Sequence, residues 1–90
     1  MLVIVKSSPD SNAAQRGLTI ARDLSSDVVL MQNAVYLAGT GAWEGFGGKV
    51  YAVDEDVRLR GSGVSEEVQM IGYDELVELM SLSDKVIGMF

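Results

Sequence analysis

The sequence contains no cysteine and no histidine among its 90 residues. Without a thiol, the chain cannot form disulfides, carry a persulfide or supply a thiolate nucleophile. Without an imidazole, it lacks the usual acid–base group at neutral pH, and the two absences together remove the ligands of tetrahedral zinc sites. We therefore expect no enzyme activity of its own and no bound cofactor or metal.

Basic residues and long apolar runs are also scarce. Seven Lys and Arg stand against thirteen Asp and Glu, which gives a formal net charge of −6. Nucleic-acid-binding surfaces need clustered positive charge, so we expect no direct binding of tRNA or DNA. No apolar run approaches the ~20 residues of a membrane-spanning helix, and the first residues lack the basic start of a signal peptide. These features predict a cytoplasmic protein that does not contact a membrane.

Apolar runs of strand length alternate with amphipathic segments along the whole chain. The runs at 2–5, 27–31, 50–53, 68–71 and 85–89 contain many β-branched residues and predict strands that are buried on both faces. Helices are predicted between them, the last with an apolar stripe of Tyr73, Leu76, Val77 and Met80. This order predicts an α/β fold: one domain over residues 1–90, with a mainly parallel five-stranded sheet between two layers of helices.

Local signals mark the ends of two of these helices. Ser8 followed by Pro9, or Asn12 followed by Gln15, offers a start for the helix after the first strand. The carboxylates of residues 54–56 favour a helix N-terminus, and Gly61 follows two arginines where that helix is expected to end.

Polar residues gather after the first three predicted strands, where open parallel sheets bind ligands. Ser, Asn and Asp also serve there as caps and turn residues, so their presence alone identifies no site. Asp10, Asp54 and Asp56 could hold a cation such as Mg²⁺, but carboxylates at a helix start need no such role. The glycines of segment 39–48 fit neither of the common phosphate-binding spacings. A flexible connection or a contact surface is the interpretation favoured for that segment.

Several segments in order resemble the DsrH/TusB family. They are the first strand with Ser8-Pro9, then residues 28–36, 49–61 and 71–79, and finally Asp84-Lys85-Val86. Residues 49–61, which run from Lys-Val-Tyr-Ala through the acidic helix to Arg-Gly, form the most specific part. The family usually has Asp/Asn-Gly where this chain has Asn33-Ala34, so we expect a different local turn there.

The resemblance implies a small subunit of a sulfur-relay complex, which would work with DsrE/TusD-like and DsrF/TusC-like proteins. In such complexes sulfur passes as a cysteine persulfide, for 2-thiouridine at the tRNA wobble position or for sulfur oxidation. Since this chain has no cysteine, its partners would carry the sulfur. Aromatic and arginine side chains are common interface anchors, and Trp43 is expected to be exposed because glycines surround it. The candidate interface residues are Asn33, Tyr36, Trp43, Phe46, Asp54, Asp56 and Arg58.

A second hypothesis is a free-standing homo-oligomer that binds a small ligand or a protein at the carboxyl ends of its strands. Association is expected under both hypotheses, because 48% of the residues are apolar in a chain too short to bury them all. A carboxylate-dependent enzyme is a third, weaker alternative, since no group is present to activate a nucleophile.

Overall fold

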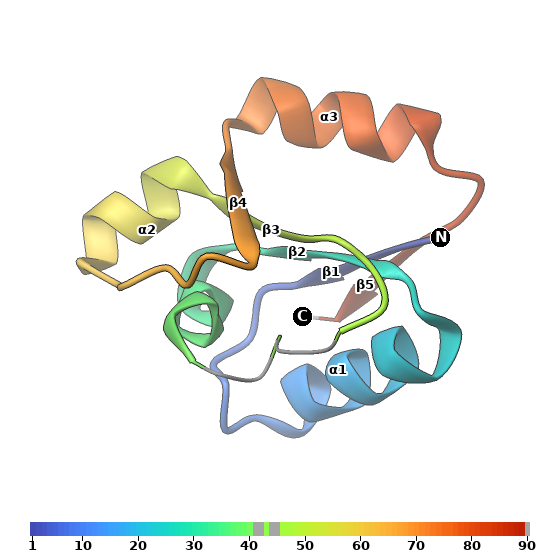
Figure 1. Cartoon of the computed structure of the whole chain (residues 1–90), viewed down its shortest axis with the longest axis horizontal. Helices are drawn as coiled ribbons and strands as arrows, with labels where there is room; N and C mark the ends of the chain where they lie inside the picture. The colour runs from blue at the N-terminus through green and yellow to red at the C-terminus, as the bar shows by residue number, and fades with distance from the viewer. Residues whose placement is uncertain (41–42, 44–45, 90) are drawn as a thin grey trace.

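A parallel sheet with helices on both faces forms the computed structural model, which describes residues 1–40, 43 and 46–89 (Figure 1). The elements are β1 (Leu2–Val5), α1 (Asn12–Leu24), β2 (Asp27–Leu30), the 3₁₀ segment η1 (Gln32–Gly39), β3 (Val50–Val53), α2 (Asp54–Arg60), β4 (Val68–Ile71), α3 (Tyr73–Leu82) and β5 (Val86–Met89). Each predicted strand is confirmed to within one residue at either end. None of the helices in these residue ranges is long and apolar enough to span a membrane.

The five strands lie in the order β4-β3-β2-β1-β5, and each neighbouring pair is parallel. β1 is the second strand from one edge, paired with β2 from Leu2 opposite Asp27 and with β5 from Leu2 opposite Val86. The predicted α/β class and three-layer architecture are confirmed, and the sheet is parallel throughout its strands.

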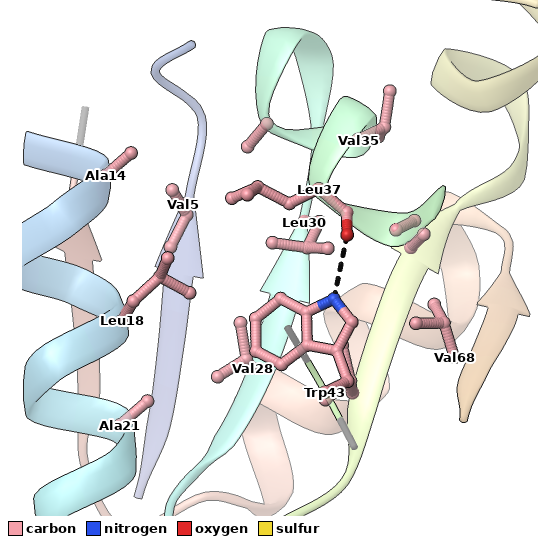
Figure 2. Packing of buried hydrophobic residues seen from close by; sticks show 14 of the residues in the cluster. Val5, Ala14, Leu18, Ala21, Val28, Leu30, Val35, Leu37, Trp43 and Val68 are labelled. Carbon is pink, nitrogen blue, oxygen red and sulfur yellow. Dashed lines mark hydrogen bonds between the residues drawn. The ribbon is translucent and has the colours of Figure 1, made fainter. Parts of the chain in front are cut away.

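Alternate residues of the central strands enter two separate cores. Val3 and Val5 of β1 join α1, η1, α2 and Trp43 in one cluster, which we call the α1-side core. Leu2 and Ile4 join Leu76 of α3 in the other, the α3-side core. Strands buried on both faces require apolar residues at every position, which explains the continuous runs in the sequence. Figure 2 shows the α1-side core, with α1 packed across β1 and the Trp43 indole against β2.

The cap of α1 differs from both predicted options. Ser11 is the N-cap, and its Oγ accepts a hydrogen bond from the Ala14 backbone N–H at 3.1 Å. Ser8 instead donates its hydroxyl to Asp10 at 2.7 Å, within the loop. Several Ser, Asp and Asn residues compete as caps here. Ser11 lies three residues before Ala14, the first buried residue of α1, on a face that also includes Gly17.

The connection after β2, where a helix was predicted, is a 3₁₀ segment of eight residues. It begins with a hydrogen bond from the Ala34 N–H to the Met31 carbonyl at 3.1 Å, and it ends with one from Thr40 to Leu37 at 3.2 Å. Bonds between residues three apart wind the chain more tightly than an α-helix does. This winding leaves Tyr36 exposed while Ala34, Val35, Leu37 and Ala38 are buried.

The glycine-rich segment 39–48 lies partly outside the described residues, but Gly47 and Gly48 have a packing role. A Cβ at Gly48 would lie 2.2 Å from the Ser26 carbonyl oxygen, and one at Gly47 would lie 2.9 Å from Ser25 Oγ. The backbone before β3 therefore passes against the end of α1 and the start of β2 at a distance that excludes any side chain. These two glycines need no phosphate ligand to explain them.

Replacing Gly48 with alanine should lower the free energy of unfolding by about 2–4 kcal/mol, because backbone must move to admit the methyl group. Urea denaturation followed by circular dichroism measures the loss. Gly63→Ala is the matched control, since a Cβ there meets nothing within 4 Å. Equal stability of the two variants would contradict the close approach at Gly48.

The predicted apolar stripe of α3 is only partly buried. Leu76 is buried in the α3-side core and Leu79 packs against it, but Val77 and Met80 are exposed. The helical period was predicted correctly, but only part of the apolar stripe is buried. α3, a helix of 10 residues, lies on this face (Figure 1), and it contacts the sheet along a narrower strip than its apolar residues occupy.

Candidate functional site

The direction of the chain connections defines a crevice between β3 and β4. The segments after β1, β2 and β3 pack in the α1-side core, whereas α3, which follows β4, packs in the α3-side core. In open parallel sheets, ligands bind outside the carboxyl ends of neighbouring strands whose connections leave to opposite faces. Here that position lies between Val53, where β3 ends, and Ile71, where β4 ends.

A buried carboxylate occupies this position. Asp56 is 5% exposed, and its Oδ2 accepts hydrogen bonds from the Gln32 backbone N–H at 2.8 Å and from the Tyr73 hydroxyl at 3.0 Å. Its Oδ1 lies 3.7 Å from a guanidinium nitrogen of Arg60, one turn along α2. Asp56 therefore joins the segments that follow β2, β3 and β4. We call Asp56 with Gln32, Tyr73 and Arg60 the carboxylate bridge.

The backbone at Gln32 depends on this bridge. Gln32 has φ of +50°, in the left-handed region that a residue other than glycine adopts at a cost of roughly 1 kcal/mol. Its N–H points to a buried acceptor, and a hydrogen bond to a carboxylate offsets that cost. Asn33 and Ala34 follow directly, inside η1. The expectation that this turn differs from the family's stays a prediction.

Asn33 extends the bridge to the surface. Arg60 Nε donates a hydrogen bond to Asn33 Oδ1 at 3.1 Å, which connects the start of η1 to the last turn of α2. Asn33 itself is exposed and Arg60 is only partly so. The sequence predicted Asn33 and Asp56 as candidates, and the structure places both around one arginine.

The other predicted residues have different surroundings. Asp54 and Arg58 form an exposed ion pair of 3.0 Å on the first turn of α2, a kind of contact that adds little stability. Tyr36 is 47% exposed on η1. Phe46 is partly buried and packs edge-to-face on Trp43, with ring centroids 5.3 Å apart.

Trp43 was expected to be exposed, and that expectation is wrong. Its side chain is 2% exposed in the α1-side core, and its Nε1 donates a hydrogen bond to the Leu37 carbonyl at 2.9 Å (Figure 2). An indole surrounded by glycines can fold back into a core when a carbonyl is available to accept its N–H. Trp43 therefore presents no surface to a partner in this structure.

Three members of the bridge were not predicted as site residues. Tyr73 was assigned to the apolar stripe of the last helix and Arg60 to the end of the helix before it, while Gln32 was one of the polar residues after the second strand. The available signal was positional. Tyr73 begins α3, which lies on the other face of the sheet, so its side chain starts beside the crevice.

The bridge has little capacity for chemistry. Oδ2 of Asp56 accepts two hydrogen bonds from the chain itself, and Oδ1 faces the Arg60 guanidinium at 3.7 Å, so the carboxylate is directed at groups of its own chain. Asp10, Asp54 and Asp56, considered above for Mg²⁺, do not assemble. Over the described residues, no group of three or more carboxylates is placed to hold a metal ion. The geometry serves to position backbone segments.

Partial desolvation of the Tyr73 phenol, whose side chain is 40% exposed, raises its pKa above the usual 10.0, and the hydrogen bond to the Asp56 carboxylate adds to the effect. A pKa raised by folding stabilises the native state below the unfolded pKa, and that contribution is lost as pH rises through the folded pKa. As the pH rises from about 9 to about 11, the free energy of unfolding should therefore fall less in Tyr73→Phe than in the unmodified protein. Urea denaturation at each pH measures both. Curves that stay parallel over this range would contradict the expectation.

Comparisons with known proteins find one matching sequence family and solved structures with a similar fold. The family model described as "DsrH like protein" matches residues 6–86. The solved structure of the ychN protein from E. coli is similar with a TM-score of 0.80 and 18% identity, over 97% of each chain. The solved structure of protein Tm0979 from Thermotoga maritima is similar with a TM-score of 0.64 and 28% identity, over 94% of this chain and 97% of that one. No curated protein sequence matches.

The likeness to ychN concerns the fold alone, whereas the family match is one of sequence and spans almost the whole chain. It covers the bridge residues Gln32, Asp56, Arg60 and Tyr73 together with all the helices. The chain therefore belongs to the DsrH-like family.

Proposed function

We propose that this protein is a non-catalytic subunit of a sulfur-relay complex, in which partner subunits carry the cysteine that receives sulfur. The observation that carries the proposal is the family match over residues 6–86 in a chain without any cysteine. A persulfide requires a thiol, and no other side chain can replace it. The protein then acts through its surface, by holding or shaping the site of a DsrE/TusD-like or DsrF/TusC-like partner.

The carboxylate bridge supports a scaffolding role. Among the described residues, the one buried carboxylate makes contacts between segments of the chain. These contacts, with the Arg60–Asn33 hydrogen bond, hold η1 and α2 in a fixed relative position. Asn33, Tyr36, Asp54 and Arg58 lie on those two elements with exposed or half-exposed side chains. We assign them to a candidate contact surface, the η1–α2 surface.

The pathway we propose is synthesis of 2-thiouridine at the tRNA wobble position, in the cytoplasm. With a net charge of −6 this chain is a poor binder of tRNA, so in this proposal another subunit contacts the RNA. The alternative, a free-standing homo-oligomer with a ligand at the strand ends, has less support because Asp56 and Tyr73 bridge the crevice where that ligand would bind.

Native mass spectrometry of the protein, alone and mixed with the DsrE/DsrF-like proteins of its own organism, tests the proposal. A defined hetero-oligomer is expected. A homo-oligomer that does not bind those proteins would refute the subunit role and favour the alternative. Loss of wobble 2-thiouridine in cells that lack this protein, measured by mass spectrometry of tRNA nucleosides, would support the pathway. Unchanged thiolation would refute the pathway without affecting the complex.

A further inference from the structure

Exposed apolar side chains are concentrated on and beside α3. Nine large hydrophobic residues of the described chain are exposed, and five of them belong to this region. Val77 is 65% exposed and Leu82 is 80% exposed. The five residues are Tyr73, Val77, Met80, Leu82 and Val86. Single exposed apolar residues are ordinary in a soluble protein, whereas a cluster of them marks a binding surface.

The exposed residues of α3 form a continuous strip. Tyr73, Val77 and Met80 follow at spacings of four and three, which places them on one side of the helix. Leu76 and Leu79 already supply the contacts to the α3-side core, so this strip is additional to what the fold requires. We call it the α3 strip.

A groove lies along the opposite flank of the same helix. It has a volume of about 290 Å³ between α3 and strands β3 and β4. Tyr51 and Ile71 of the sheet line it together with Leu79 and Leu82 of the helix. Glu75 and Glu78 also line it, against a single cation, Lys49. Both flanks of α3 thus offer apolar contacts, and the groove is bordered by more negative than positive charge.

The charge of the helix selects between possible occupants. α3 carries Asp74, Glu75 and Glu78 and no Lys or Arg, and all three carboxylates are exposed. A second copy of this chain packed α3 to α3 would bring six carboxylates together around one apolar seam, which like-charge repulsion opposes. A different protein with Lys or Arg around its apolar residues would complement this surface. Lys85, just after the helix, and Lys49 in the groove are too few to reverse the balance.

We propose that the α3 strip, together with the groove on the other flank of α3, forms the docking surface for a different subunit, which presents apolar side chains bordered by Lys or Arg. The inference rests on the proposed function, because it takes the occupant to be one of the subunits of the sulfur-relay complex. It adds a contact on α3 to the η1–α2 surface assigned above.

The test measures binding of the organism's DsrE/DsrF-like proteins to the full-length chain by isothermal titration calorimetry. The double variant Val77→Ser, Met80→Ser should weaken binding roughly tenfold or more. Its matched control is Leu24→Ser, which removes a side chain that is 56% exposed on α1, outside both proposed contact surfaces. Because all three side chains are exposed, the variants should fold, and circular dichroism of each sample checks this.

A charge pair makes the second arm of the test. Glu78→Lys and Glu67→Lys change the net charge by the same amount, but only Glu78 is on α3. Glu78→Lys should slow association and weaken binding several-fold, with a loss that shrinks as salt rises, while Glu67→Lys should bind as the unmodified protein does.

The outcomes separate this inference from the proposed function. Normal binding by the α3 variants in a complex that still forms would overturn the α3 surface and leave the subunit role standing. A homodimer of the chain alone that Val77→Ser, Met80→Ser dissociates would overturn the choice of occupant. No binding of any partner by the unmodified protein would overturn both.

Discussion

Trp43→Ala is expected to lower the free energy of unfolding by about 3–5 kcal/mol, the cost of removing a large aromatic side chain from a packed core. The indole is 2% exposed among residues of α1, β2 and η1, and it also supports the ring of Phe46. A domain of this size has roughly 5–10 kcal/mol of total stability, so much of it would be lost. Urea denaturation followed by circular dichroism at 222 nm gives the value.

Two comparison variants separate packing from hydrogen bonding. Trp43→Phe keeps a ring in the core, and the Leu37 carbonyl still accepts from the Thr40 N–H and hydroxyl, so we expect a loss of only about 1–2 kcal/mol. Tyr36→Ala removes an aromatic ring that is 47% exposed, and it should cost less than Trp43→Ala. If Trp43→Ala proved no more destabilising than Tyr36→Ala, the indole would not be part of the core.

Asp56→Ala is expected to cost about 2–4 kcal/mol, although it removes only a small side chain. The Gln32 N–H loses the acceptor that offsets its left-handed conformation, and the Tyr73 hydroxyl loses its partner. The guanidinium of Arg60 loses its nearest carboxylate as well. The same denaturation assay measures the change.

Asp54→Ala is the control for Asp56→Ala, because Asp54 is also an acidic residue at the start of α2 but is paired only with the exposed Arg58. It should change stability by less than about 1 kcal/mol. A double-mutant cycle of Asp56→Ala with Tyr73→Phe adds a second check, since two residues that share a hydrogen bond should give non-additive effects. Additive losses would mean that the bond contributes nothing to stability.

Features with local causes could be predicted from the sequence. The strands follow from apolar runs, and α2 follows from carboxylates at its start and Gly61 at its end, where Gly61 adopts φ of +61°. The alternation of strands and helices fixes the α/β class, and short right-handed connections then leave few arrangements of a parallel sheet. No distant contact is needed for any of these steps.

Features that depend on distant contacts could not be predicted. The burial of Asp56 rests on Gln32, 24 residues earlier, and on Tyr73, 17 residues later. In the sequence the same carboxylate is explained by the helix dipole alone. Trp43 is similar, because its neighbours are glycines and the partner that draws it inward is a carbonyl of η1. For α3 the period showed a helix, but which apolar residues reach the sheet depends on the strands beneath it.

The position of β5 has a consequence for how the protein is made. β1 and β5, which lie near opposite ends of the sequence, pair with each other. Among the described residues, α3 is the helix packed in the α3-side core, and it comes immediately before β5. A nascent chain that has emerged only as far as β4 lacks α3 and β5, so any sheet that it forms has no helix on the α3 side. One face of its sheet, including Leu2, Ile4 and Val29, would then remain uncovered. Contacts between residues far apart in sequence form slowly, and uncovered apolar sheet promotes aggregation. Synthesis therefore passes through a stage at which a chaperone, or a partner subunit already present, would have an apolar surface to bind.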